Sequence, residues 1–383
     1  MTFKKVAGFV HRWLGLIAGL VVFISLLAAS IYVWEKELTS LIHHDAVYVP
    51  EVKAVKLPFH VLLASAQNAM PGKNIIRAEF NNDPRKAYAF TVYKESHKKG
   101  WTYYSSTEYN YIVYVDPYTG KVQGIVNTTT DFVTCLYPIH ACLLLNYDIG
   151  HYIVGGATLI IVIMVITGIM LWWPKNRAAF KQRYWFRWKS TTKWRRKNYD
   201  FHNIGGIYSF ILILIMALTG VVWTFDWWEN SIYRLMGATP GKVFKEPPPA
   251  KSAADSTRHA YDVAFNDALA KVRDWENFII DVPVAPFDSA QAISCFIKRG
   301  QRGSGWDETD EFYYDPKTGK EYWQYLHEEK NLGAKWRYSN YAIHTGSIYG
   351  MPTKILACLG ALFCATLPLT GFLIWWGKRR KAR

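Results

Sequence analysis

Four stretches of the chain are apolar throughout and contain no charged side chain. They cover residues 14–33, 152–173, 204–225 and 355–376, and each contains 20 to 22 residues. As helices rising about 1.5 Å per residue they would be roughly 30–33 Å long, which matches a bilayer core of about 30 Å. The pattern therefore predicts four transmembrane helices. The first stretch is too long for a secretory signal and no small-residue cleavage site follows it, so we expect a retained anchor.

The long segments that follow the first and third helices combine helical and strand-like patterns. The first segment has a helical run, FHVLLASAQNAM, and then NIIRAEF, AYAFTVY and YIVYVDP; the second has ADSTRHAYDVAFNDALAKVRD and then NFIIDVPV, AISCFIK and EFYYDP. Each contains an Asp-Pro-x-Thr-Gly-Lys stretch, at 116–121 and 315–320, which is typical of a turn between two strands. We expect a small α/β domain from each segment.

The order of these features is repeated in the two halves of the chain. Each half begins with a histidine and an apolar helix, passes through a soluble segment, and ends with a histidine, a second helix and a Trp-Trp pair. Both halves have the same membrane orientation, so four helices around a pseudo-twofold axis along the membrane normal are the simplest arrangement. The expected fold class is an integral membrane α-helical protein with two pseudo-twofold-related repeats, each carrying an α/β domain outside the membrane.

The domain boundaries follow from this order. In the first half we expect transmembrane helix 1 at 1–34, an outer domain at 35–136, and a lead-in with transmembrane helix 2 at 137–174, followed by a basic loop at 175–201. In the second half we expect transmembrane helix 3 at 202–226, an outer domain at 227–340, and a lead-in with transmembrane helix 4 at 341–377, followed by a basic tail at 378–383.

The charge distribution indicates the orientation. The net charge is +15, and residues 174–203 hold ten Lys or Arg against one acid. The positive-inside rule places this loop and both termini in the cytoplasm. Since the basic residues lie at membrane ends, we expect contact with anionic lipid and no nucleic-acid partner.

The five cysteines exclude two kinds of site. No CxxC or CxxCH occurs, so neither a zinc cluster nor covalently attached c-type haem is indicated. Whether Cys135, Cys142 and Cys295 form disulfides stays open.

Four of the eleven histidines occupy repeat-related positions. His11 and His202 stand at the starts of the first and third helices, and His140 and His344 stand just outside the starts of the second and fourth. Ionisable groups at membrane depth are costly unless they have a partner. Two b-type haems, each held by two neutral imidazoles from facing helices, would explain the pattern: His11 with His202, and His140 with His344. The alternative for each histidine alone is a hydrogen bond to lipid headgroups or a helix end.

Small residues near the ligands would give a porphyrin flat room beside the backbone. The expected residues are Gly15, Gly19, Gly205, Gly206 and Gly346. Glycines at the spacing of Gly15 and Gly19 are equally typical of helix packing.

His151 is an alternative outer ligand. It lies eleven residues beyond His140, but Asn146, Asp148 and Gly150 predict a break between them. His151 would replace His140 as ligand, or lie beside a haem as a proton or substrate contact.

The quoted motifs resemble a known family. VHRWLGLIAGL near the N-terminus, IHACLLLNYDIGHYIVGG and TGIMLWWPK in the middle, and IHTGSIYGMP and TGFLIWWGK at the end resemble the PepSY-associated transmembrane helix family, and the DPxTGK hairpins look like PepSY domains. The resemblance covers nearly the whole chain and implies a bacterial inner-membrane protein with two periplasmic domains, tied to iron uptake. Four-helix members are similar to di-haem reductases of ferrioxamine-type siderophores, and their helix-start histidines correspond to His11, His140, His202 and His344. This chain departs from the family at 202–206, where HNIGG replaces HRWLG.

The resulting hypothesis is a transmembrane ferric-siderophore reductase with two haem b groups and a substrate of the hydroxamate type. No GxGxxG nicotinamide fingerprint occurs, so a membrane quinol or a separate reductase is the expected electron donor. The substrate is expected in an outer cleft near His140, His151 and His344. Candidate lining residues, which could instead be ordinary hairpin-tip packing, are Trp101, Tyr103, Tyr104 and Trp306.

Two rival functions stay open. A siderophore or iron permease needs polar or broken helices near the midplane, and these helices are apolar. A non-enzymatic regulatory protein that binds partners through its PepSY-like domains would not explain the membrane histidines. The sequence indicates neither the siderophore nor an oligomeric state.

Overall fold

The computed structural model describes residues 3–97, 100–250, 258–283, 291–300 and 305–379. The chain divides into two compact units. One, the helix unit, comprises Met1–Val33, Leu136–Asn230 and Asn340–Arg383; the other, the sheet unit, comprises Trp34–Cys135 and Ser231–Ser339. Each is described by itself below.

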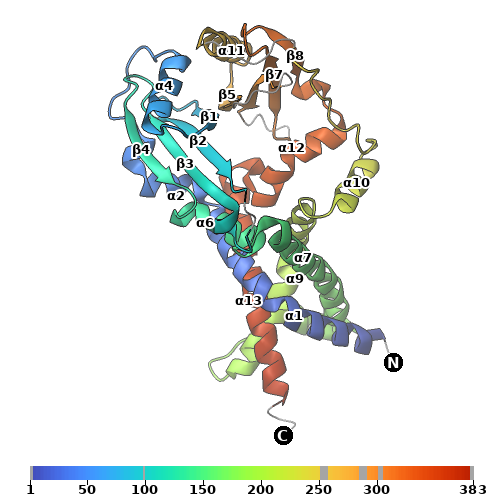
Figure 1. The fold of residues 1–383 in the computed structure, drawn as a ribbon. Helices are drawn as coiled ribbons and strands as arrows, with labels where there is room; N and C mark the ends of the chain where they lie inside the picture. Colours follow the sequence, from blue (N-terminus) through green and yellow to red (C-terminus); the bar gives the residue numbers. More distant parts are fainter. Residues whose placement is uncertain (1–2, 98–99, 251–257, 284–290, 301–304, 380–383) are drawn as a thin grey trace. The chain divides into compact units, whose positions relative to one another are not determined.

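The helix unit is built on four helices that are long and apolar enough to cross a membrane. These are α1 (Phe3–Tyr32), α7 (Tyr147–Trp172), α9 (Trp194–Val221) and α13 (Met351–Arg379). Helix α1 packs against α7 and α13, and α9 packs against the same two helices, so α1 and α9 are opposite members of the bundle (Figure 1). The four predicted spans are confirmed, and the chain is a multi-pass membrane protein.

Shorter helices precede or connect the spans. They are α6 (Phe132–Cys142), α8 (Arg177–Tyr184), α10 (Asp226–Leu235), α12 (Leu332–Thr345) and the 3-10 turn η2 (Ser347–Tyr349). Helices α6 and α12 carry His140 and His344. Helix α9 begins at Trp194, so the last residues of the expected basic loop are helical.

The sheet unit contains one antiparallel sheet of eight strands. The strands are β1 (Ile75–Asn81), β2 (Tyr88–Glu95), β3 (Thr107–Val115), β4 (Val122–Asn127), β5 (Trp275–Asp281), β6 (Ile293–Arg299), β7 (Thr309–Tyr314) and β8 (Glu321–Tyr325), in the order β4-β3-β2-β1-β5-β6-β7-β8. Strands β1 and β5 pair antiparallel, with Phe80 opposite Phe278 and Arg77 opposite Asp281. The two segments expected as separate domains therefore share one sheet, joined at its centre.

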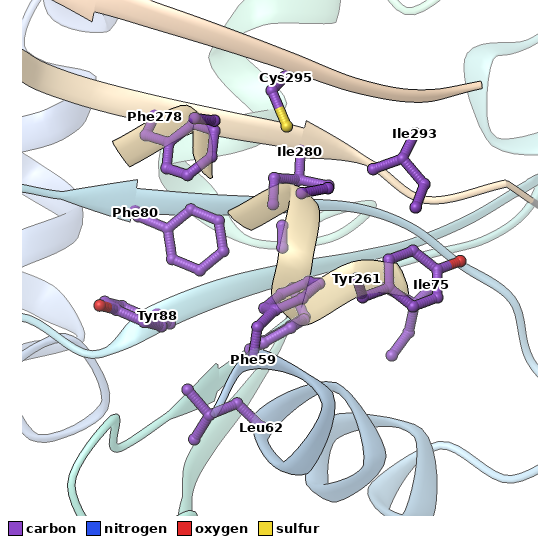
Figure 2. Close-up of a cluster of buried hydrophobic side chains, with 14 of the residues drawn as sticks. Phe59, Leu62, Ile75, Phe80, Tyr88, Tyr261, Phe278, Ile280, Ile293 and Cys295 are labelled. Carbon is purple, nitrogen blue, oxygen red and sulfur yellow. The ribbon is translucent and has the colours of Figure 1, made fainter. Parts of the chain in front are cut away.

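Both halves also share one hydrophobic core. Helices α4 (Phe59–Ala69) and α11 (Arg258–Lys271) contribute buried residues to the same cluster as strands from each half. Figure 2 shows Phe59 and Leu62 of α4 beneath Phe80 and Phe278 of the central strands. The rings of Phe59 and Phe80 lie 5.7 Å apart and those of Phe80 and Phe278 lie 5.3 Å apart. This core crosses the junction between the halves.

The predicted turns are confirmed at both DPxTGK stretches, which connect β3 to β4 and β7 to β8. Gly120 and Gly319 have φ values of 72° and 68°, which L side chains rarely adopt. A Cβ at Gly319 would lie 2.4 Å from the carbonyl oxygen of Ala260. The remaining short helices of the sheet unit are α2 (Glu35–Ile42), α3 (His44–Val47), α5 (Tyr103–Ser106) and the 3-10 turn η1 (His327–Glu329).

Candidate functional site

The helix unit brings four histidines together as two pairs. The ring centres of His11 and His202 lie 6.3 Å apart, and those of His140 and His344 lie 6.1 Å apart. His11 comes from α1 and His202 from α9, whereas the second pair comes from α6 and α12. The pairs therefore join residues from the two halves of the chain, as the repeat predicts.

The pairs lie at different depths along the helices. Ser25 of α1 contacts His140, and it lies fourteen residues beyond His11 on the same helix. Thr219 of α9 contacts His344, seventeen residues beyond His202. At about 1.5 Å per residue these separations are about 21 Å and 26 Å.

Three of the four rings are held by a threonine of a neighbouring span. Nδ1 of His11 lies 3.0 Å from Oγ1 of Thr167 on α7. The same contact recurs as 2.8 Å between His202 and Thr370 on α13, and as 3.0 Å between His344 and Thr219 on α9. One type of contact thus fixes rings in both pairs.

These contacts determine the tautomer of the rings. Each threonine hydroxyl donates to the backbone carbonyl four residues earlier, as Thr167 does to Ile163 at 2.9 Å; Thr219 and Thr370 do the same to Ile215 and Thr366. Since the hydroxyl hydrogen is used there, the oxygen accepts from Nδ1–H of the histidine. Each ring then keeps the lone pair of Nε2, for which the described residues supply no hydrogen-bond donor, and Nε2 is the atom that ligates a metal.

His140 reaches the same tautomer through Ser25. Its Nδ1 lies 3.1 Å from the backbone carbonyl oxygen of Ser25 and 2.9 Å from Oγ. The Ser25 hydroxyl donates to the carbonyl of His140 at 2.9 Å. A carbonyl oxygen only accepts, so Nδ1 of His140 also carries the hydrogen.

Glycines let three of the rings approach a neighbouring helix. A Cβ placed at Gly168, Gly220 or Gly371 would lie 3.4, 3.1 or 3.3 Å from Cε1 of His11, His344 or His202, respectively. Each of these glycines directly follows the threonine that holds the same ring. A Thr-Gly dipeptide therefore provides both the hydrogen-bond acceptor for Nδ1–H and the space for the histidine ring.

Two histidines have a further anchor one helical turn earlier. Asn198, four residues before His202, donates its amide to the carbonyl of Thr370 at 3.1 Å. Asn340, four residues before His344, donates to the carbonyl of Thr219 at 3.1 Å. Both asparagines are buried. In the first half the equivalent positions are Ala7 and Leu136, which have no side-chain donor.

The spacing within each pair is that of two ligands on one metal. Bonds of about 2.0–2.1 Å from a metal to two imidazole nitrogens, with about 1.1 Å from each nitrogen to its ring centre, would put the ring centres about 6.3 Å apart. The observed 6.3 and 6.1 Å agree with this spacing. In the part of the chain that the structure describes, no group of three or more His, Cys, Asp or Glu could hold a bare ion. The pairs suit a metal whose other ligands come from a planar macrocycle.

Most glycines expected beside a porphyrin lie elsewhere. Cβ atoms at Gly15, Gly19 and Gly205 would contact Met164, Pro368 and Phe363 of neighbouring spans, so these glycines serve helix packing. Gly346 has a φ of 74° and forms the turn after α12. Of the five, Gly206 has no described atom within 4 Å of its Cβ position.

Among the described residues, His151 is not paired with another histidine. Helix α6 ends at Cys142 and α7 begins at Tyr147, so the predicted break is confirmed. The His151 ring lies 4.8 Å from Tyr147 and 3.9 Å from Tyr152, and Nδ1 contacts the carbonyl of Tyr147. The structure therefore pairs His140, rather than His151, with His344.

The aromatic residues expected to line a substrate cleft are not brought together. Trp101, Tyr103 and Tyr104 lie between β2 and β3, and Trp306 lies between β6 and β7. Because β1 and β5 are antiparallel, these two connections lie at opposite ends of the strands. They are also separated by about four strand spacings, or roughly 19 Å, across the sheet. The four side chains cannot line a single cleft.

Sequence reasoning missed the residues that hold the rings. Thr167, Thr219 and Thr370 are each followed by glycine near the end of an apolar span. This threefold Thr-Gly recurrence was the available signal. Ser25 has no following glycine and gives no comparable signal.

Comparisons with known proteins agree with this architecture. The family model described as PepSY-associated TM region matches residues 9–378. A search of curated proteins finds no match.

Proposed function

Because the chain belongs to the PepSY-associated transmembrane family, we propose that it is a haem b protein that carries electrons across the membrane to a ferric siderophore. The observation that carries the proposal is the two histidine pairs, with ring centres 6.3 and 6.1 Å apart at two depths of one bundle. Two redox centres at different depths form a path from one face of a membrane to the other.

His11 and His202 would hold one haem, and His140 and His344 would hold the other. A bound haem supplies one-electron chemistry at a potential set by its axial ligands and their surroundings. The chain contributes neutral imidazoles in one tautomer, because threonine and serine groups accept from every Nδ1. The apolar helices keep water away from the pairs, and hydrogen bonds at Nδ1 raise the basicity of the ligands.

The orientation follows from charge. The basic residues between α7 and α9 and at the C-terminal end support an orientation with these segments on the cytoplasmic side of a bacterial inner membrane. The pair of His11 and His202 then lies on the cytoplasmic side, and the pair of His140 and His344 lies on the periplasmic side. The two repeats, related by a pseudo-twofold axis, contribute one histidine each to both pairs.

The proposed reaction adds one electron to Fe(III) held by a siderophore and yields Fe(II). Hydroxamate oxygens bind Fe(III) much better than Fe(II), so reduction loosens the metal. The electron comes from a membrane quinol or a separate cytoplasmic reductase. The resemblance to ferrioxamine-type reductases supports this substrate class.

A visible spectrum of the purified protein tests the proposal. After expression with sufficient haem, the detergent-solubilised protein should show a Soret band and, when reduced, an α band in the region of b-type cytochromes. The pyridine haemochrome assay should give two haems per chain, and anaerobic addition of a ferric hydroxamate siderophore should reoxidise the reduced protein. A colourless protein would refute haem binding, and a haem protein that the siderophore does not reoxidise would refute the substrate.

One variant tests the ligand assignment. His202→Ala should lower the haem content from two to one per chain and leave the second spectrum intact. His97→Ala, which changes a histidine of the β2–β3 connection, is the matched control and should retain both haems. Retention of both haems by His202→Ala would refute the pairing.

A further inference from the structure

His140 and His344, which we call the outer pair, are held by different contacts. His344 is anchored at three points on one dipeptide of α9: its Nδ1 meets Thr219, its Cε1 lies against Gly220, and Asn340 donates to the Thr219 carbonyl. Asn340 is fully buried, so water does not compete for this bond. Helix α12 is thus docked on α9 at the point where its ligand is held.

The helix that carries His140 has its second bond at His140 itself, where the Ser25 hydroxyl donates to the backbone carbonyl, and has no side-chain anchor one turn earlier. The residue one turn earlier is Leu136, which has no amide to donate. Pro138 stands inside α6 and removes one helical hydrogen bond, whereas the equivalent residue before His344 is Ala342. All side-chain bonds of His140 therefore go to one residue, Ser25, whereas α12 is bonded to α9 both at His344 and one turn earlier at Asn340.

The chain after His140 is also strained. Leu143 and Leu144 have φ values of 57° and 59°, and they are the non-glycine residues with positive φ among those described. L side chains disfavour this left-handed conformation because Cβ approaches the following carbonyl oxygen. After His344 the left-handed position is occupied by Gly346, at 74°, which has no Cβ.

The strained leucines hold the last turn of α6 closed. The amide of Leu144 donates to the Pro138 carbonyl at 3.1 Å, and that of Leu143 donates to the Ile139 carbonyl at 3.2 Å. The φ of Leu143 positions the amide of Leu144, so relaxing Leu143 to negative φ breaks the bond to the Pro138 carbonyl, whereas the Leu143 amide keeps its bond to Ile139. Relief of the strain at Leu143 therefore loosens the end of the turn that carries His140.

We propose that His344 is the permanent ligand of the outer haem and His140 the exchangeable one, so that a small external donor molecule can bind in place of His140. The inference rests on the proposed function. Asn340 lies on the Thr219 side of the His344 ring, away from His140, so it supports His344 and leaves the place of His140 to the incoming molecule.

Alanine variants of the two ligands provide the first test. His140→Ala should keep two haems per chain, with one of them changed to a five-coordinate, high-spin spectrum, because the anchored His344 retains it. His344→Ala should retain one haem. Equal loss of haem from both variants, or greater loss from His140→Ala, would overturn the proposal.

Carbon monoxide titration of the dithionite-reduced protein provides a second test that does not depend on removing a ligand. In the unaltered protein, half of the haem should bind carbon monoxide. The double variant Leu143→Gly, Leu144→Gly removes the Cβ strain and should bind it about fivefold to thirtyfold more weakly, a range that corresponds to one left-handed residue, Leu143, whose φ positions the bonded amide of Leu144. Leu145→Gly, in the same loop, is the control and should behave as the unaltered protein.

The outcomes separate this inference from the proposed function. A protein without a haem spectrum refutes the proposed function itself. A protein with two haems in which neither or both bind carbon monoxide, or in which the double variant binds it as tightly as the unaltered protein, refutes the exchange of His140 alone.

Discussion

Nδ1 of His202 lies 2.8 Å from Oγ1 of Thr370, and the two residues are 168 positions apart in the chain. The Thr370 hydroxyl donates its hydrogen to the carbonyl of Thr366 and accepts from the ring, while its own carbonyl accepts from Asn198. One threonine therefore fixes the orientation and the tautomer of a histidine on another membrane span.

Removing the Thr370 hydroxyl should weaken haem binding at the pair of His11 and His202. Thr370→Val keeps the shape of the side chain but leaves Nδ1–H of His202 without its acceptor. Loss of such outer-shell partners typically costs about tenfold to a hundredfold in metal affinity, so we expect faster haem loss from one of the two sites and a shifted midpoint potential. Potentiometric titration and haem transfer to apomyoglobin measure these quantities. Thr370→Ser restores the hydroxyl and should recover both values; a serine variant as impaired as the valine variant would contradict this role.

The glycine beside His344 should resist substitution. In Gly220→Ala the new Cβ would lie 3.1 Å from Cε1 of the ring, so the ring or helix α9 must move by a few tenths of an ångström. Overpacking of this kind typically costs about 1–3 kcal/mol, and we expect an altered spectrum of the outer haem with lower occupancy. The matched control is Gly156→Ala on α7, whose Cβ meets no described atom within 4 Å. Identical spectra for the two alanine variants would refute the close approach.

The sequence alone predicted the elements well because their causes are local. Uninterrupted apolar runs predicted the four spans. Runs of alternating apolar and polar residues, bounded by Asp-Pro and Thr-Gly turns, predicted the strands. The positions of His11, His140, His202 and His344 followed from the repeat. These features need only neighbouring residues or the comparison of one half with the other.

What the sequence did not predict depends on long-range pairing. Nothing in the patterns of β1 and β5 indicates that these strands pair, because an alternating strand can pair on either edge. That pairing merges the two expected domains and places Trp101 and Trp306 at opposite ends of the sheet. Likewise, the hydroxyl residue that holds each histidine ring was not predicted, because it lies on another span, far away in the sequence.

His327 should make the protein less stable in mild acid. It is 5 % exposed, and Nδ1 has no hydrogen-bond partner among the described residues. Burial is the main cause that lowers its pKa below 6.5; Glu308 and Glu328 oppose the shift, and Lys330 and Lys335 add to it. Between the folded pKa and about 6.5 the unfolded chain binds the proton and the folded chain does not, so stability falls as pH decreases, by at most about 1.4 kcal/mol per pH unit.

Thermal unfolding at pH 7.5 and 5.5, followed by tryptophan emission, measures this effect. His327→Gln removes the titrating group, so its midpoint should fall less between the two pH values than that of the unaltered protein. Glu276→Ala, which changes an exposed side chain, should fall as the unaltered protein does. Equal pH dependence in His327→Gln and the unaltered protein would show that other groups are responsible.

Phe80→Ala should destabilise both halves of the sheet unit together. Phe80 is 1 % exposed and lies on β1 against Phe59 of α4 and Phe278 of β5, so its removal opens a cavity at the junction. Such a truncation typically costs about 3–5 kcal/mol. Hydrogen exchange followed by mass spectrometry should show lost protection in β2 and also in β6, because one core spans the junction. Glu276→Ala, on the exposed face of β5, should leave both strands protected; loss confined to β2 in Phe80→Ala would mean that the two halves unfold independently.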